Sequence, residues 1–163
     1  MEKTNVMRIL DQKKISYTPY SYANTNAISG MEVATVLNQN PNQVFKTLVT
    51  KTSNNKLYVF VIPVNKELDL KLASKSVNEK SIEMLKSKDL LPLTGYIHGG
   101  CSPIGMKKFY PTTFDKSISN FETIIFSAGK IGYQVEININ DLSKVINYET
   151  ADITKEILWL KNP

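Results

Sequence analysis

Six of the seven glycines in the chain fall into two short segments, and these segments are the first candidates for a ligand site. Residues 94–108 hold four glycines and end in two lysines, and residues 127–132 hold two glycines around Lys130. Consecutive backbone N–H groups in such a loop can point at one acceptor, either a phosphate or a carbonyl oxygen that gains negative charge. The two loops therefore predict a site for an anionic, phosphorylated partner.

Neither loop fits a standard nucleotide motif. Gly100 and Gly105 have the separation of a Walker loop, but Met106 follows where that motif requires lysine. The second loop lacks both the spacing and a following helix, so the dinucleotide fingerprint fails as well. Two tight turns remain the competing interpretation, which is weaker for the first loop because turns rarely need four glycines in so short a span.

Lys46 is the second candidate. It lies near the start of an expected strand with Val44 and Leu48 on its own face, while Phe45 and Val49 occupy the other face. A strand that is apolar on both faces is usually buried on both. A lysine in such a strand either extends its ammonium group to the sheet edge or faces an anionic ligand, and the sequence leaves both interpretations open.

Cys101 and His98 suggest a third chemistry, because a Cys–His pair can activate a thiol nucleophile. Their spacing matches no family signature, and a small buried hydrophobic role for the free cysteine is favoured. One histidine and one cysteine cannot form a typical zinc site, so no metal and no cofactor are expected.

The elements that must position these residues are mixed strands and helices. Residues 44–52 and 57–63 flank a turn-forming triplet and predict a hairpin. Residues 123–128 read as a strand, and residues 133–139 alternate with a period of two, so the second glycine loop joins strand to strand. Short extended segments are also predicted at 15–22 and 81–84, and helices at residues 4–14 with Thr4 as cap, from the capping box at 29–32, at 69–76, at 86–91 ending at Pro92, after Asn140 and at 153–160.

This irregular order of elements excludes a regular βαβ repeat and predicts a mixed α/β (α+β) fold: a single domain, residues 1–163, with a curved, barrel-like mixed β-sheet surrounded by helices. The net charge of +5 favours a polyanionic partner such as nucleic acid. A single cysteine fits a reducing compartment. The start of the chain lacks the apolar core of a signal peptide, and the longest apolar run, 57–64, is too short to span a bilayer. A cytoplasmic protein with no membrane partner is expected.

Several segments together resemble one family, the YbaK/EbsC-type aminoacyl-tRNA deacylases, which are relatives of the editing domain of bacterial prolyl-tRNA synthetases. The resemblance covers about residues 6–152 and leaves 153–163 as a C-terminal extension. The long glycine signature, in the right order after the lysine-bearing strand, is the specific part. The matching segments are residues 43–49, 68–71, 94–105, 111–115 and 127–132.

The resemblance implies trans-editing, which is hydrolysis of the ester that joins a wrong amino acid to the terminal adenosine of tRNA. The expected substrates are Cys-tRNA(Pro) and Ala-tRNA(Pro), and the implied partners are the acceptor end of the mischarged proline tRNA and, as a candidate, prolyl-tRNA synthetase. An aminoacyl ester is already activated, so positioning and carbonyl polarisation carry much of the catalysis. In the family, the thiol of a cysteinyl substrate is thought to attack its own carbonyl, whereas water would attack an alanyl ester.

The resemblance also implies site residues. Lys46 would hold the terminal nucleotide's phosphate or the polar end of the aminoacyl group, and the backbone N–H of Gly99 with its neighbour Gly100 would hold the ester carbonyl. Tyr22 would line the pocket or contact the adenosine, and the second loop would contribute Ser127. The implied set is Lys46, Gly99 and Gly100 as catalytic residues and Tyr22, Ser127, Gly129 and Gln134 as substrate-binding residues.

Two positions depart from the family pattern. Gln134 stands where the cysteine-specific branch carries an acidic residue, which leaves the edited amino acid open. This amide also motivates an alternative function, a non-catalytic module that binds aminoacyl-tRNA ends or nucleotides. Cys101 stands where the family commonly carries an apolar residue, which supports a structural role for its thiol.

Overall fold

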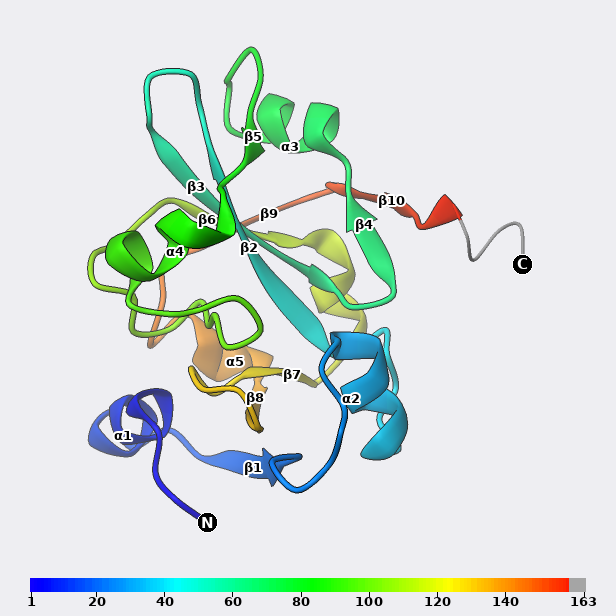
Figure 1. The fold of residues 1–163 in the computed structure, drawn as a ribbon. Coiled ribbons are helices and arrows are strands. Elements are labelled where there is room, and N and C mark those ends of the chain that lie inside the picture. The colour runs from blue at the N-terminus through cyan, green and yellow to red at the C-terminus, as the bar shows by residue number, and fades with distance from the viewer. Residues whose placement is uncertain (159–163) are drawn as a thin grey trace.

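The strands within residues 1–158 form three separate sheets. The computed structural model describes residues 1–158, and Figure 1 shows the arrangement of their elements. The largest sheet has the order β5-β2-β3-β6-β9, with β2 antiparallel to β3 and to β5, and with β6 parallel to both β3 and β9. Its strands are β2 (Phe45–Lys51), β3 (Leu57–Pro63), β5 (Glu83–Met84), β6 (Thr112–Asp115) and β9 (Glu149–Ala151).

The second sheet is an antiparallel three-stranded sheet of order β1-β8-β7, and the third pairs β10 with β4. Their bounds are β1 (Tyr17–Ser21), β7 (Thr123–Ser127), β8 (Tyr133–Asn138), β4 (Lys66–Leu68) and β10 (Thr154–Glu156). The mixed α/β fold is as predicted, but none of these sheets closes on itself. The barrel-like part of the prediction is therefore not supported, because the strand pairing is divided among three sheets.

The two larger sheets meet at the start of β2. Val44 forms an isolated parallel bridge with Ile125 of β7, and the Ile125 N–H donates to the Gln43 carbonyl oxygen over 3.1 Å. The Gln43 carboxamide donates to both the carbonyl and the hydroxyl oxygen of Thr123, each over 2.9 Å. This junction fixes the β7–β8 hairpin against the lysine-bearing strand.

Local signals set most of the helices. Thr4 accepts the Met7 N–H at the start of α1, and Ser29 and Glu32 complete the predicted capping box at the start of α2. Asp69 caps α3 by accepting two backbone N–H groups. The helical elements are α1 (Asn5–Gln12), α2 (Gly30–Val36), α3 (Leu70–Ser76), α4 (Ser87–Thr94), α5 (Ile139–Leu142) and the 3₁₀ helix η1 (Lys116–Asn120).

Two boundary predictions and one prediction of element type are wrong. α4 continues through Pro92 to Thr94, because the buried Leu90 and Thr94 hold its last turn in the core and the left-handed Gly95, whose N–H donates to the Leu91 carbonyl over 2.9 Å, ends it. α5 begins two residues earlier than expected, with Asn138 as its cap. The predicted helix at 153–160 is replaced by β10 over the described positions Thr154–Glu156, which pair with β4, while residues 159 and 160 lie outside the described chain.

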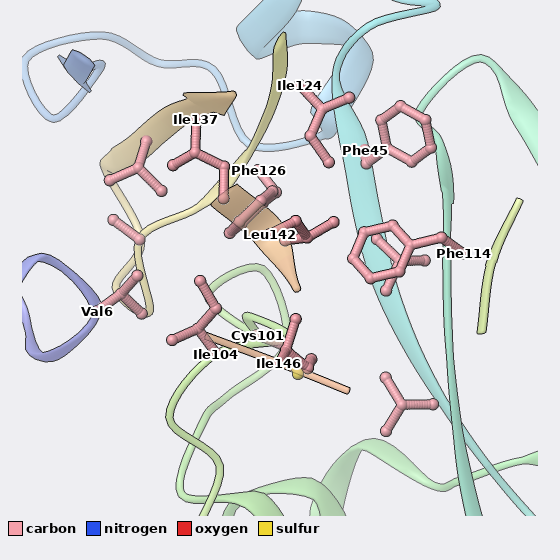
Figure 2. Packing of buried hydrophobic residues seen from close by; sticks show 14 of the residues in the cluster. Val6, Phe45, Cys101, Ile104, Phe114, Ile124, Phe126, Ile137, Leu142 and Ile146 are labelled. Atoms are coloured by element: carbon pink, nitrogen blue, oxygen red, sulfur yellow. The ribbon is translucent and has the colours of Figure 1, made fainter. Parts of the chain in front are cut away.

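The core explains why β2 is apolar on both faces. Phe45 and Val49 pack into a large cluster that also holds Phe114 and Phe126, and Figure 2 shows several of these side chains meeting between the two larger sheets. Leu48 packs on the other face against a second cluster. The sheet is thus buried on both sides along β2, as predicted. Within residues 1–158, no helix is long and apolar enough to cross a membrane.

Candidate active site

A pocket of about 300 Å³ lies between the start of α2, the first half of β2 and the first glycine loop. Five of the seven residues in the predicted site line it, and these are Tyr22, Lys46, Gly99, Ser127 and Gln134. Gly100 and Gly129 are not among its lining residues. The pocket therefore gathers side chains from the five-stranded sheet, the three-stranded sheet and the loop between α4 and β6.

The open edge of β2 explains where this pocket forms. On the side away from β3, the described backbone partners are the bridge at Val44, the Leu85 N–H, which donates to the Val49 carbonyl oxygen over 2.9 Å, and the pairing of Thr50 and Lys51 with β5. The backbone from Lys46 to Leu48 pairs with no described strand on this side. Consecutive residues from Val44 to Leu48 line the pocket for this reason, although alternation alone would send their side chains to opposite faces.

Lys46 is a half-buried cation in this wall. Burial lowers the pKa of its ammonium group, and the nearby carboxylate of Glu67 opposes that shift. No described carboxylate lies within ion-pair distance of Lys46, in contrast to Lys51 on the same strand, which pairs with Glu83 at 3.7 Å. A partly desolvated lysine without an ion pair favours the approach of an anion or of a strongly polar acceptor.

The two central glycines of the first loop differ. Gly99 adopts φ +89°, a left-handed conformation that favours glycine, and its N–H has no acceptor among the described residues. The Gly100 N–H donates to the Ile97 carbonyl oxygen over 2.9 Å, so it closes a turn instead of facing the pocket. A Cβ at Gly100 would lie 3.1 Å from the Ile131 nitrogen, so this glycine lets the two loops approach closely.

The second loop contributes Ser127, while Gly129 lies behind it. Gly129 adopts φ +88°, and a Cβ there would lie 2.9 Å from Cε1 of Tyr96 and 3.0 Å from Cγ2 of Val6. The Gly129 N–H donates to the Ser127 hydroxyl oxygen over 3.1 Å. The hydroxyl hydrogen of Ser127 therefore remains available to donate into the pocket.

Gln134 reaches the pocket from β8, where it lies between Tyr20 of β1 and Ser127 of β7. Its side chain is almost fully buried, and its Oε1 accepts a hydrogen bond of 2.8 Å from Nε2 of Gln39. The pocket wall also holds Thr47, whose buried hydroxyl has no partner. Sequence reasoning missed Thr47, since it follows Lys46 directly and alternation assigns it to the opposite face.

Cys101 lines the pocket but belongs to the core. Figure 2 shows it among the buried side chains of the large cluster, and burial raises the pKa of its thiol to about 12. His98 is exposed at the pocket wall and makes no hydrogen bond to this thiol. The structural interpretation of Cys101 is favoured, because a neutral buried thiol is a poor nucleophile at neutral pH. No group of histidine, cysteine or acidic side chains in residues 1–158 is arranged to hold a metal.

The pocket is rich in hydrogen-bond donors and poor in bases. Its described lining contains no aspartate or glutamate, whereas Lys46, the Gly99 N–H and the Ser127 hydroxyl can all donate. Such a set stabilises negative charge that develops on an oxygen atom. It does not supply a paired nucleophile and general base.

Comparisons with known proteins agree on one family. The model of the aminoacyl-tRNA editing domain matches residues 25–145. A protein of Enterococcus faecalis strain V583, provisionally named Cys-tRNA(Pro)/Cys-tRNA(Cys) deacylase EbsC, is 44% identical over 154 residues, which cover 94% of each chain.

Solved structures share the fold at low sequence identity. One, provisionally described as a trans-editing enzyme for prolyl-tRNA synthetase, superposes with a TM-score of 0.79 at 19% identity and covers 94% of this chain and 99% of its own. Another, described as a hypothetical protein, gives a TM-score of 0.82 at 17% identity, with 92% and 99% covered.

Proposed function

The chain belongs to the family of aminoacyl-tRNA editing domains, and from this premise we propose that it is a deacylase that removes wrong amino acids from tRNA in trans. The family match covers more than half of the chain, and the Enterococcus faecalis relative is similar over nearly its whole length. The substrate proposed is mischarged tRNA, with Cys-tRNA(Pro) and Ala-tRNA(Pro) as the first candidates. The name of the relative supports the cysteinyl substrate.

The observation that carries the proposal is one pocket with a half-buried unpaired lysine and an unpaired loop amide in its walls. Lys46 and the Gly99 N–H both donate, and no carboxylate of the described lining competes for them. In the proposed complex, the Gly99 N–H binds the ester carbonyl oxygen as it gains negative charge. Lys46 binds the terminal phosphate or the polar end of the aminoacyl group.

The reaction proposed needs no protein nucleophile. With a cysteinyl ester, the substrate's sulfur attacks its own carbonyl carbon, a carbon–sulfur bond forms, and the carbon–oxygen bond to the ribose breaks. The thiol proton passes to the departing ribose oxygen, so the products are a cyclic thioester and deacylated tRNA. With an alanyl ester, a water molecule attacks instead, and alanine is released. Both routes use the pocket to orient the ester and to stabilise the oxyanion.

Lys46→Ala is the direct test. Removal of a charged hydrogen-bond partner costs about 1.5–3 kcal/mol, so kcat/KM for deacylation falls roughly 10- to 100-fold. Lys51→Ala is the matched control, because Lys51 lies on the same strand, pairs with Glu83 and does not line the pocket. Lys46→Met separates loss of charge from loss of packing, since it retains an apolar stem.

The assay uses a panel of mischarged tRNAs with the wild-type protein and the three variants. Equal rates for wild type and Lys46→Ala would remove Lys46 from the mechanism. Failure to deacylate any mischarged tRNA would refute the proposal that the protein is a deacylase.

A non-catalytic binding module is the second candidate. The donor-rich pocket without a nucleophile–base pair favours it, since such a site suits binding as well as catalysis. Tight binding of aminoacyl-tRNA without hydrolysis would support this alternative, and multiple turnover would exclude it. Both candidates act on tRNA, so we propose a cytoplasmic location and treat prolyl-tRNA synthetase as a partner to be tested by co-purification.

A further inference from the structure

Two glutamine side chains that are 95 positions apart form a pair behind the pocket. Nε2 of Gln39 donates to Oε1 of Gln134 over 2.8 Å. Gln134 lines the pocket, whereas Gln39 is not among its lining residues. Gln39 therefore contacts the site only through Gln134.

Both members of the pair are fixed by their backbones. Gln39 follows the end of α2, where Asn38 adopts φ +54° and the Gln39 N–H donates to the Ala34 carbonyl oxygen over 2.8 Å. This bond closes the helix end and sets the direction in which the Gln39 side chain leaves the backbone. Gln134 lies on the central strand of its sheet, with β1 on one side and β7 on the other.

The pairing decides which end of the Gln134 carboxamide faces the pocket. Its Oε1 is used by Gln39. Its Nε2 has no described protein partner and keeps some accessible surface, which we assign to the pocket that Gln134 lines. The pocket thus receives an N–H donor from a residue that could equally have offered an acceptor.

This arrangement leaves one polar atom of Gln39 without a hydrogen bond. Its Oε1 is buried without a hydrogen-bond partner, which lowers stability relative to a satisfied pair. In the reversed pair, Gln134 would donate to Gln39 and turn its own oxygen to the pocket. The direction of this single hydrogen bond therefore decides whether Gln134 presents a donor or an acceptor to the pocket.

We propose that Gln39 is a positioning residue that orients Gln134 as a hydrogen-bond donor into the pocket, and that this donor selects aminoacyl groups that carry an acceptor, the sulfur of cysteine over the methyl group of alanine. The inference rests on the proposed function, since it assumes an aminoacylated terminus in the pocket. Sulfur accepts a hydrogen bond weakly as a thiol and more strongly as a thiolate, whereas a methyl group accepts none. Because the described lining has no carboxylate, no negatively charged acceptor there competes with the ligand for this donor.

The test measures binding of two stable ligands, the cysteinyl and alanyl amides of 3′-amino-3′-deoxyadenosine, by calorimetry. The wild-type protein is expected to bind the cysteinyl ligand roughly 3- to 10-fold more tightly, the range of one hydrogen bond. Gln39→Met removes the donor that holds Gln134 and should bring the ratio close to one. Gln39→Glu places an acceptor opposite Gln134, draws Nε2 away from the pocket and should lower the ratio as well.

Gln43→Met is the matched control. Gln43, two residues before β2, also binds the β7–β8 hairpin through its carboxamide, but it bonds to Thr123 and does not line the pocket. This variant should weaken the fold without changing the ratio of the two affinities. If Gln39→Glu does not fold, Gln39→Met carries the test.

Three outcomes would overturn the inference. The wild-type protein could bind the cysteinyl and alanyl ligands with equal affinity, or Gln39→Met could weaken binding of both ligands equally, as Gln43→Met does. The ratio of cysteinyl to alanyl affinity could also be higher in Gln39→Glu than in the wild type. Because the readout is binding, a protein that prefers the cysteinyl ligand but never hydrolyses tRNA refutes the proposed deacylase and leaves the role of Gln39 standing. A protein that hydrolyses mischarged tRNA but binds both ligands equally refutes the role of Gln39 and leaves the proposed deacylase standing.

Discussion

The two glycine loops look alike in the sequence but have different roles in the structure. In the first loop, Gly99 lines the pocket and leaves its N–H without a described acceptor. In the second loop, Gly129 and Gly132 both have positive φ, and neither lines the pocket. Gly129 instead lets the hairpin turn pack on Tyr96 of the first loop.

The difference shows that glycine content marks close approach of backbone without saying what approaches. Among the described residues, Gly99 is the one pocket-lining glycine that has a positive φ and an N–H without a protein acceptor. Gly100 and Gly129 allow two pieces of protein to pack against each other. The second loop supports the site from behind, and its direct contribution is Ser127.

The largest expected effect is on the alkylation rate of Cys101, which lies in the part of the first loop that faces the core. Because burial raises the pKa of Cys101 to about 12, its thiolate fraction at pH 8 is about 10³-fold below that of an ordinary exposed cysteine. Alkylation by iodoacetamide, followed by mass spectrometry, should be slower by at least this factor in the native protein than in urea. Rapid labelling of Cys101 in the native protein, with loss of activity, would instead support a catalytic role for its thiol. It would also contradict the assignment of this part of the first loop to the core.

Gly99→Ala should show the next largest effect. The new Cβ would lie 3.6 Å from Ile131, an ordinary contact, but a φ of +89° is strained for alanine by about 1–2 kcal/mol. Relief of that strain turns the N–H away from the pocket, so kcat/KM should fall about 10²-fold, the cost of one oxyanion donor. Deacylation assays and urea unfolding of the same preparation separate the two effects. A variant of full activity would leave the first loop without a catalytic donor.

Gly129→Ala should show the opposite pattern. The positive φ and the close contacts with Tyr96 and Val6 should together lower the free energy of unfolding by about 2–3 kcal/mol. The activity of the folded fraction should change much less than in Gly99→Ala. Denaturant unfolding measures the first quantity, and assays at a temperature where the variant is folded measure the second. A stable but inactive Gly129→Ala protein would make the second loop a direct part of the site.

The sequence predicts well what depends on neighbouring residues. The capping box of Ser29 and Glu32, the Thr4 cap and the hairpin of β2 and β3 are all confirmed, because each is set within a few positions. The resemblance predicts that the lysine strand and the first loop contribute to one site, and Lys46 and Gly99 line the same pocket.

Features that depend on distant pairing could not be predicted. β10 exists because Thr154 and its neighbours pair with β4, and the same residues taken alone suggested a helix. The sequence predicts one curved sheet where the structure has three, because the sequence alone does not show which strands pair with one another. The bond between Gln39 and Gln134 joins a helix end to a central strand, and neither residue carries a local signal of the other.

The junction at Val44 and Ile125 has a consequence for how changes in one sheet reach the other. Lys46 and Gln134 line one pocket from different sheets, and the bridge and the Gln43 contacts join those sheets beside it. Phe126 and Val135 of the hairpin also pack in the same core cluster as Phe45. A substitution that moves the β7–β8 hairpin is therefore expected to move the strand that carries Lys46 as well, so the two walls of the pocket cannot vary independently.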